Sequence, residues 1–281
     1  MGYKNSNIAD KDHVIGTTAD GLVVIRSGIR AREIGVLDPF VSWFVTEEGH
    51  RLVQVAKKTD QVYEEFNLSR FKFTTSRLRF SVAHFEQMVF LGSGFDCRAV
   101  WLDEFQSGRV TVFEVDTPDK LGQKIGILRK HGVRIPAWNK HIMADLKNHP
   151  VPDLLVAKGF QLSLPTLVLL EGVLFYLPPE ISRSILHPEW LKLCPGSTVL
   201  FDFWSDSRVR GLNVRVKEKL GTELFHKFPF SNNPNELKAE LARLGYHQIN
   251  IIPLENLAQE YYRRRITDEF PDSWFIVEAT V

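Results

Sequence analysis

The sequence lacks several features that would mark other classes of protein. It contains only two cysteines, Cys97 and Cys194, among 281 residues, which is too few for a disulfide framework and gives no cluster typical of a metal site. Its 35 basic and 34 acidic residues leave a net charge of +1, so the charge does not favour nucleic acid or a membrane surface as a partner. No run of 18 apolar residues occurs, and the N-terminus has no hydrophobic signal region. We therefore expect a cytoplasmic globular protein without a resident metal.

The sequence does contain an alternation of apolar runs and helical patterns that begins near residue 86. We predict strands, in chain order, at 88–91, 110–114, 133–138, 166–170, 198–203, 247–252 and 274–280. Helices are predicted between them at 98–105, 118–131, 179–186 and 235–244. This alternation is typical of an α/β fold with a mostly parallel sheet covered on both faces. The link 256–272 is too polar for a predicted helix, so the last two strands are expected to form an antiparallel hairpin at one edge.

The first 85 residues follow a helical rhythm instead. Apolar residues at helix-like spacing predict helices from about 18 to 58 and from 63 to 85. The pair Asp38-Pro39 is typical of a helix start, because Asp caps a helix and Pro is tolerated at its first position. The predicted organisation is therefore an N-terminal helical cap, residues 1–85, and a ligand-binding core, residues 86–281.

The first predicted strand of the core ends in the turn Gly92-Ser93-Gly94. Glycines at this place let the backbone approach a ligand closely. Asp116 ends the next strand, roughly 20 residues further on, where an acidic residue can bind the hydroxyls of a ribose. The third glycine of the dinucleotide fingerprint is missing, because Cys97 stands there, and the turn carries Asp96. Both features disfavour NAD or FAD and favour a cationic cofactor without phosphates, such as S-adenosylmethionine.

Two further acidic residues are predicted near strand ends. Asp145 lies beyond the third predicted strand, and Glu171 directly follows the fourth. In sheets of this kind ligands bind at the carboxyl ends of the strands, near the point where the strand order reverses. We therefore expect Asp145 and Glu171 to share one pocket with Gly92 and Asp116.

Several motifs, in the same order along the chain, resemble those of leucine carboxyl methyltransferases and their bacterial relatives, which include polyketide O-methyltransferases. They are Phe90-Leu91-Gly92-Ser93-Gly94-Phe95-Asp96-Cys97-Arg98, Phe113-Glu114-Val115-Asp116, Ala144-Asp145-Leu146 and Leu170-Glu171-Gly172-Val173-Leu174-Phe175-Tyr176-Leu177. The resemblance covers roughly residues 26–205. It implies a class I methyltransferase fold, with a Rossmann-like sheet of seven strands. It also implies S-adenosyl-L-methionine as cofactor and S-adenosyl-L-homocysteine as product.

The resemblance also implies roles for individual residues. Arg77, with Arg30 beside it, would bind the carboxylate of the methionyl part of the cofactor, and Glu171 would bind its amine. The remaining cofactor residues would be those of the glycine turn, the ribose partner and the pair that frames the adenine: Gly92, Gly94, Asp116, Asp145 and Leu146. A zwitterionic methionyl group needs a cation and an anion close together, and charge-assisted hydrogen bonds are the stronger ones.

The methyl acceptor is less well defined by the sequence. Relatives commonly have an acidic pair where this chain has Ser81-Val82, and a Trp near the segment Lys147-Asn148-His149-Pro150. No well-supported general base is present, which favours a carboxylate acceptor that needs none. We therefore predict methylation of a small-molecule or peptide carboxylate to a methyl ester, with Tyr176 and Trp204 as candidate acceptor contacts. The alternatives are a hydroxyl O-methyltransferase of a secondary metabolite, a non-catalytic nucleoside-binding protein and an NAD(P)-dependent oxidoreductase.

Overall fold

The centre of the molecule is a sheet of seven strands. The structure, a computed structural model, describes residues 11–281, with side chains from Thr18 onward. The strand order is β3-β2-β1-β4-β5-β7-β6, and the first five of these neighbours run parallel. The bounds are β1 Gln87–Leu91, β2 Thr111–Asp116, β3 Asn139–Met143, β4 Thr166–Leu170, β5 Thr198–Trp204, β6 His247–Pro253 and β7 Trp274–Thr280. The predicted fold class is confirmed, including the antiparallel pairing of the last two strands at one edge.

Two predictions for the sheet need correction. The third strand does not lie at 133–138, because Pro136 interrupts that stretch and cannot donate to a ladder; β3 begins at Asn139 and pairs with β2 from Val112 onward. The link between the last two strands, which was predicted not to be helical, contains the helix α12, Leu254–Tyr262. Its polar residues face outward while Leu254 and Ala258 are fully buried. The edge pair is therefore antiparallel but is not joined by a short hairpin.

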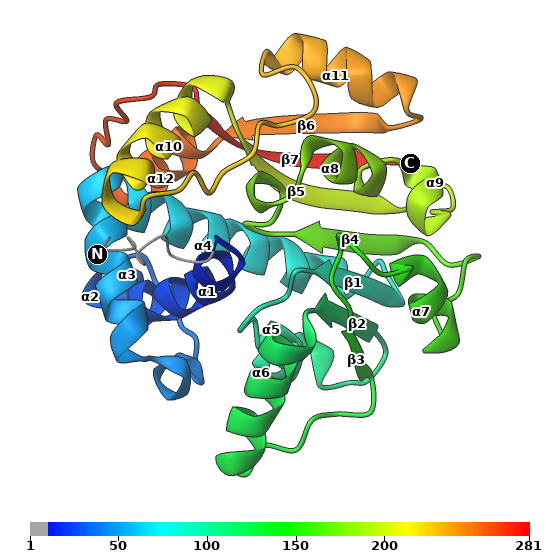
Figure 1. Cartoon of the computed structure of the whole chain (residues 1–281). Helices are drawn as coiled ribbons and strands as arrows, with labels where there is room; N and C mark the ends of the chain where they lie inside the picture. The colour runs from blue at the N-terminus through cyan, green and yellow to red at the C-terminus, as the bar shows by residue number, and fades with distance from the viewer. Residues whose placement is uncertain (1–10) are drawn as a thin grey trace, which may run out of the picture.

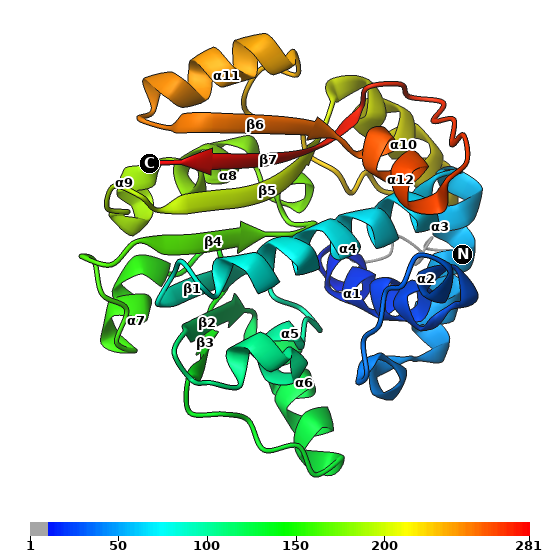
Figure 2. The same cartoon turned by 180° about the vertical axis from the view of Figure 1, so that it is seen from behind.

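Helices cover both faces of the sheet (Figures 1 and 2). Those of the core are α5 Arg98–Trp101, η2 Asp103–Phe105, α6 Pro118–Lys130, α7 Val151–Ala157, η3 Leu174–Tyr176, α8 Pro179–Ile185, α9 Pro188–Leu191, α10 Asp206–Leu220, α11 Pro234–Arg243 and α12. Helices were predicted close to α6, α8 and α11. The single helix expected at 98–105 is divided into α5 and η2 at Leu102, whose backbone is extended. Sequence patterns missed α7, α9, α10 and α12.

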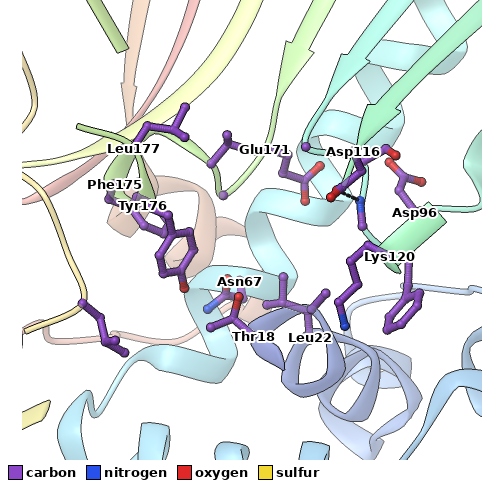
Figure 3. A pocket seen from close by; sticks show the side chains of 18 of the residues that line it. Thr18, Leu22, Asn67, Asp96, Asp116, Lys120, Glu171, Phe175, Tyr176 and Leu177 are labelled. Atoms are coloured by element: carbon purple, nitrogen blue, oxygen red, sulfur yellow. Dashed lines mark hydrogen bonds between the residues drawn. The ribbon is translucent and has the colours of Figure 1, made fainter. Parts of the chain in front are cut away.

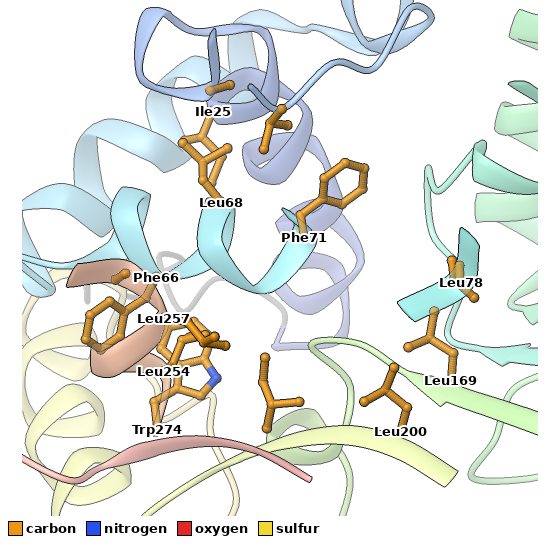
Figure 4. Close-up of a cluster of buried hydrophobic side chains, with 14 of the residues drawn as sticks. Ile25, Phe66, Leu68, Phe71, Leu78, Leu169, Leu200, Leu254, Leu257 and Trp274 are labelled. Carbon is orange, nitrogen blue, oxygen red and sulfur yellow. The ribbon is translucent and has the colours of Figure 1, made fainter. Parts of the chain in front are cut away.

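The alternation of side chains along each strand places a hydrophobic core on both sides of the sheet. On β1, Met88 and Phe90 join the core beneath α4 and α12, while Val89 and Leu91 join the core beneath α7, α8 and α11. All five side chains of β1 are buried, as expected for a central parallel strand. Figure 4 shows the first of these cores, where residues from α1, α4, β4, β5, β7 and α12 meet.

The N-terminal helices lie at the end of the sheet where the parallel strands finish (Figures 1 and 2). They are α1 Lys11–Ser27, α2 Ile29–Glu33, η1 Val41–Phe44, α3 Glu47–Thr59 and α4 Tyr63–Ser81. The pair Asp38-Pro39 does not start an α-helix: Asp38 accepts the N–H of Phe40, and only the 3-10 turn η1 follows. Residues 1–10 of the predicted cap lie outside the described residues. The helix α4 continues from this end of the molecule across one face of the sheet.

Candidate active site

A cavity of about 690 Å³ lies where the parallel strands end, between the sheet and α1, α3, α4 and α10. It spans the switch point of the sheet, because Gly92 follows β1 and Glu171 follows β4, the two strands at which the order reverses. Figure 3 shows Asp96, Asp116 and Lys120 on one side, Phe175, Tyr176 and Leu177 on the other, and Glu171 between them. The cavity therefore has a polar part, around the ends of β1 and β2, and a less polar part beyond Glu171.

The glycine turn after β1 brings bare backbone to the cavity. Gly92 and Gly94 have φ angles of +70° and +47°, which residues other than glycine seldom adopt. A Cβ at Gly92 would lie only 2.5 Å from Cγ2 of Val173. The N–H of Gly92 is bonded to the carbonyl of Val115 at 2.8 Å, which fixes the turn against the end of β2. The turn is thus shaped for close contact with a ligand.

Two carboxylates at strand ends are held in place by backbone N–H groups. Asp116, the last residue of β2, accepts the N–H of Gly94 and that of Thr117, each at 2.7 Å. Asp145, two residues beyond β3, accepts the N–H of Lys147 at 2.8 Å. Both residues line the cavity, together with Leu146. The orientation of each carboxylate is therefore set by the protein before any ligand binds.

Glu171 belongs to a buried group of charges beside the cavity. Its Oε2 accepts hydrogen bonds from Nη2 of Arg98 and Oγ1 of Thr74, each at 2.7 Å, and its Oε1 lies 3.5 Å from Nε of Arg70. Burial disfavours the charged carboxylate, but the guanidinium groups of Arg98 and Arg70 outweigh it and hold the pKa of Glu171 below its usual range. Glu171 is therefore ionised at neutral pH.

The same two arginines bind two further carboxylates. Asp96 accepts hydrogen bonds from the Arg98 side chain through both oxygens, Oδ1 at 3.0 Å and Oδ2 at 2.6 Å, and Asp202 accepts one from Arg70 at 2.8 Å. Burial of Asp96 is again outweighed by Arg98, which keeps the pKa of Asp96 low. Three carboxylates thus face two guanidinium groups. The one net negative charge that remains beside the cavity favours a cationic ligand.

The other part of the cavity is lined almost entirely by carbon. We call it the apolar chamber; its residues, from α3, η3, β5, α10 and the segment after α10, are Leu52, Val55, Ala56, Phe175, Trp204, Leu212, Val216, Leu220, Leu224 and Phe225. The ring of Phe175 stacks on Trp204 with centroids 3.9 Å apart, and Phe225 meets Trp204 edge-on at 4.7 Å. The chamber is therefore suited to an apolar molecule placed next to the polar part.

The model of one protein family, "Leucine carboxyl methyltransferase", matches residues 29–188, more than half of the chain. The chain belongs to this family. A putative S-adenosyl-L-methionine-dependent methyltransferase of Rhodococcus jostii (strain RHA1) is 29% identical over 225 residues, which cover 78% of this chain and 74% of that protein. A relative with the same description from Mycolicibacterium paratuberculosis is 33% identical over 181 residues, covering 63% of this chain and 57% of that protein.

Solved structures of two proteins share the fold of this leucine carboxyl methyltransferase family member over nearly its whole length. A putative methyltransferase from Thermobifida fusca YX superimposes with a TM-score of 0.62 at 19% identity, covering 95% of this chain and 94% of that one. A DUF574 family protein from Streptomyces avermitilis gives 0.63 at 11% identity, covering 94% and 99%. At such identities the likeness concerns the fold. Together with the family match and the named relatives, it identifies the protein as an S-adenosylmethionine-dependent methyltransferase.

The cavity of this methyltransferase fits that cofactor. S-Adenosylmethionine carries a sulfonium and an ammonium group, for which the net negative charge around Glu171 is complementary. The glycine turn brings its backbone to the cavity, which Gly92 and Gly94 both line, and Asp116 and Asp145 stand at the ends of adjacent strands. A cofactor without phosphates also agrees with the carboxylate of Asp96 in the turn. The described residues contain no group of three or more side chains that could hold a metal ion.

Two of the predicted cofactor residues, Arg77 and Arg30, are not among the residues that line the cavity. Arg77 lies on α4 about two turns beyond Arg70, the last residue of that helix to line the cavity, and its guanidinium pairs with Glu278 of β7. Arg30, on α2, pairs with Glu64 and Glu65 instead. All the other predicted residues line the cavity, including the candidate acceptor contacts Tyr176 and Trp204.

Two further cations that line this part of the cavity, Arg26 and Lys120, are residues that the sequence analysis did not single out. Arg26 of α1 donates to the carbonyl of Phe95 in the glycine turn at 3.2 Å and lies 3.6 Å from Asp38. Lys120 of α6 donates to Asp20 at 2.9 Å. No motif marks Arg26, and only the packing of α1 against the glycine turn brings it here.

One face of α4 also contributes residues that the sequence analysis missed. Tyr63, Asn67 and Arg70 line the cavity, and Thr74 bonds to Glu171 from the next turn. Their spacing of four, three and four residues is that of one helix face, so a polar stripe was the available signal. Tyr176 approaches the same region (Figure 3) and is hydrogen-bonded to the side chain of Thr18. The stripe lies between the polar part of the cavity and the apolar chamber.

None of the helices in the described part of the chain is both long and apolar enough to cross a membrane.

Proposed function

We propose that this methyltransferase converts the carboxylate of a small molecule into a methyl ester. The observation that carries the proposal is that the described residues around the polar stripe of α4 offer no usable base for deprotonating a hydroxyl group. Among the described lining residues none is a histidine, and Asp60 is paired with Arg208. Burial raises the pKa of Tyr176 to about 12 and also raises that of Tyr63, so neither phenol is ionised at neutral pH.

A carboxylate is the acceptor that such a site can use. A carboxyl group with a pKa near 4 is already ionised at pH 7, and it loses no proton when it is methylated, whereas a hydroxyl group must transfer its proton to a base. When bound, S-adenosylmethionine supplies the methyl group together with its thioether leaving group. The task left to the protein is to orient the two reactants, which can contribute roughly 7–11 kcal/mol to lowering the barrier.

We assign the cofactor to the polar part of the cavity. Glu171 would bind the ammonium group, and Arg26 replaces Arg77 and Arg30 as the partner of the methionyl carboxylate. Arg26 is supported by its position on the glycine turn and by its nearly buried side chain, 9% exposed. The remaining contacts follow the strand ends: Gly92 and Gly94 beneath the methionyl group, Asp116 at the ribose, Asp145 and Leu146 at the adenine.

The polar stripe of α4 is then the place for the acceptor carboxylate. Arg70 of this stripe is shared with Asp202 and Glu171, and the hydroxyl group of Tyr176 can donate a hydrogen bond to an acceptor oxygen. Trp204 would contact the body of the acceptor. We also propose that residues 1–85 act as a cap over residues 86–281 and that the enzyme works in the cytoplasm without nucleic acid or membrane partners, as its charge and composition suggest.

Titration calorimetry and a pH–rate profile test this proposal. S-Adenosylhomocysteine should bind with micromolar affinity, about −8 kcal/mol, and NADP⁺ should give no heat. With a carboxylate acceptor, the rate of the methyl-transfer step should change little between pH 6 and 8. A rate that rises through neutral pH would point to a hydroxyl acceptor. Binding of S-adenosylhomocysteine without turnover of any acid or alcohol would favour a non-catalytic binding protein.

A further inference from the structure

One wall of the apolar chamber is formed by α10 and belongs only partly to the main cores. On α10, Leu212, Val216 and Leu220 follow at intervals of four residues, so they share one helix face, and all three line the chamber. Leu212 belongs to the core around α4 and α12, whereas Val216 and Leu224 form a small cluster apart from it. Val214, which lies between Leu212 and Val216 in sequence, is 60% exposed. The apolar face of α10 is therefore turned toward the cavity.

The side of the chamber opposite α10 is formed by three residues of α3, Leu52, Val55 and Ala56, which also line the cavity. The aromatic pair Phe175 and Trp204 closes the end nearest the sheet. Each of these two rings is at least nine-tenths buried. A molecule in the chamber would thus touch aliphatic side chains on two sides and aromatic side chains at its end.

Polar partners are scarce in this part of the cavity. Asp60 is neutralised by Arg208 and accepts the N–H of Val62 at 3.2 Å. Thr59 donates to the carbonyl of Ala56 at 2.8 Å, and Asn67 donates to the carbonyl of Tyr63 at 2.7 Å. A buried peptide would bring an N–H and a C=O for every residue, and each one left without a partner costs free energy. The chamber therefore disfavours a peptide and favours a hydrocarbon body.

The volume of the cavity also favours a small acceptor. The whole cavity, about 690 Å³, falls within the range of pockets that hold a single drug-sized ligand, and in this enzyme it must hold the cofactor as well. We infer that the acceptor is a small monocarboxylic acid whose carboxylate lies at the polar stripe of α4 and whose aliphatic or aromatic body fills the apolar chamber. This inference rests on the proposed function for the carboxylate and on the chamber alone for the body.

A panel of acids and two matched variants test it. Formation of S-adenosylhomocysteine is measured with hexanoate, decanoate, 2-naphthoate and the dipeptide Ala-Phe. We expect kcat/KM to be at least tenfold higher for decanoate or naphthoate than for the dipeptide. Val216→Trp, which fills the chamber, should lower kcat/KM for the larger acids at least tenfold while hexanoate is less affected. Val214→Trp, on the outer face of the same helix, should behave like the wild type.

Binding of S-adenosylhomocysteine to each variant shows whether it is folded. If Val216→Trp does not fold, Ala56→Leu narrows the chamber from α3 and should give the same change in preference. Preferred methylation of the dipeptide, or equal effects of the substitutions at 214 and 216, would overturn the inference. If alcohols with the same apolar bodies are methylated and the acids are not, the chamber assignment stands and the proposed carboxylate chemistry fails.

Discussion

Glu171 and Arg98 are joined by a hydrogen bond of 2.7 Å that links the end of β4 to the start of α5 beside the cavity. The side chain of Arg98 is 1% exposed and that of Glu171 is 13% exposed, so the pair is buried but Glu171 still reaches the cavity. Arg98 also binds Asp96 within the glycine turn. One guanidinium group therefore couples the position of the proposed ammonium partner to that of the turn on which the cofactor lies.

Glu171→Gln should lower both cofactor affinity and stability. The substitution removes the charge-assisted contacts of Glu171 with Arg98 and Arg70, while Asp96 and Asp202 still balance the two guanidinium groups, so we expect a loss of about 1.5–3 kcal/mol in stability. The folded-state pKa of Glu171 lies below the ordinary 4.5, so the carboxylate stabilises the fold above pH 4.5 and loses this effect as pH falls through its lowered pKa. Urea unfolding should show a constant difference between wild type and variant from pH 8 to 5 that narrows below about pH 4.5. A difference that grows on acidification would contradict the assignment.

Arg26→Gln and Arg77→Gln should separate the cation of the cavity from the cation predicted by the family motif. Loss of a charged hydrogen-bonding partner from the methionyl carboxylate should weaken binding of S-adenosylhomocysteine by about 1.5–3 kcal/mol, tenfold or more. Arg77 is 37% exposed in its pair with Glu278, so its substitution should cost ~0–1 kcal/mol of stability and leave affinity unchanged. Calorimetry at one salt concentration makes the comparison. Weaker binding by Arg77→Gln alone would restore the motif-based role.

Asp116→Asn should weaken cofactor binding while the protein stays folded. The neutral amide replaces an ionised acceptor for the ribose hydroxyls, a loss of about 1.5–3 kcal/mol. Asp153→Asn, at an exposed position of α7, is the matched control and should bind like the wild type. Unchanged affinity in Asp116→Asn would remove the ribose from the end of β2, and Glu114 could not replace it, because Glu114 is fully buried against Lys124.

Gly92→Ala and Gly122→Ala should act in opposite directions. At Gly92 the φ angle is +70° and the new methyl group would meet Val173, so we expect a loss of about 1–3 kcal/mol in stability and weaker cofactor binding. Gly122 lies within α6 with open space around its Cβ position, and alanine there should stabilise the helix by about 0.5–1 kcal/mol. Thermal unfolding with and without S-adenosylhomocysteine measures both effects. If Gly92→Ala changed neither the stability nor the cofactor affinity, the turn would not be constrained as described.

The sequence was a good guide where local patterns and burial agree. The central strands β1 and β4 are buried along their whole length, so their continuous apolar runs and the residues that end them, Gly92 and Glu171, could be recognised. The edge strand β3 is only partly buried and begins with the polar residues Asn139-Lys140-His141. Its sequence therefore lacks the apolar run by which the central strands were recognised. In α10 the start and stop signals were present, since Ser205 caps its first turn and Gly221 ends it with a φ of +74°, but its many charged residues masked them.

What each turn of a helix contacts in the folded chain was harder to predict. Arg70 and Arg77 are seven residues apart, so they lie on nearly the same face of α4 but about two turns apart along it; Arg70 lines the cavity, whereas Arg77 pairs with Glu278 of β7. A motif gives the position of an arginine along the chain, and only the packed helix shows what that position contacts. For the same reason Arg26 could not be recognised before α1 was seen against the glycine turn.

The central claim is that a methyl group is transferred to a carboxylate in this cavity, and the stability of the product to alkali tests it most directly. Purified enzyme is incubated with S-adenosylmethionine labelled in its methyl group and with the preferred apolar acid, and the isolated product is then treated with mild alkali. The account predicts that the label is released as volatile methanol, because methyl esters are hydrolysed under these conditions. Label that stays bound to the product after the same treatment would show an ether or another alkali-stable linkage and would contradict the account.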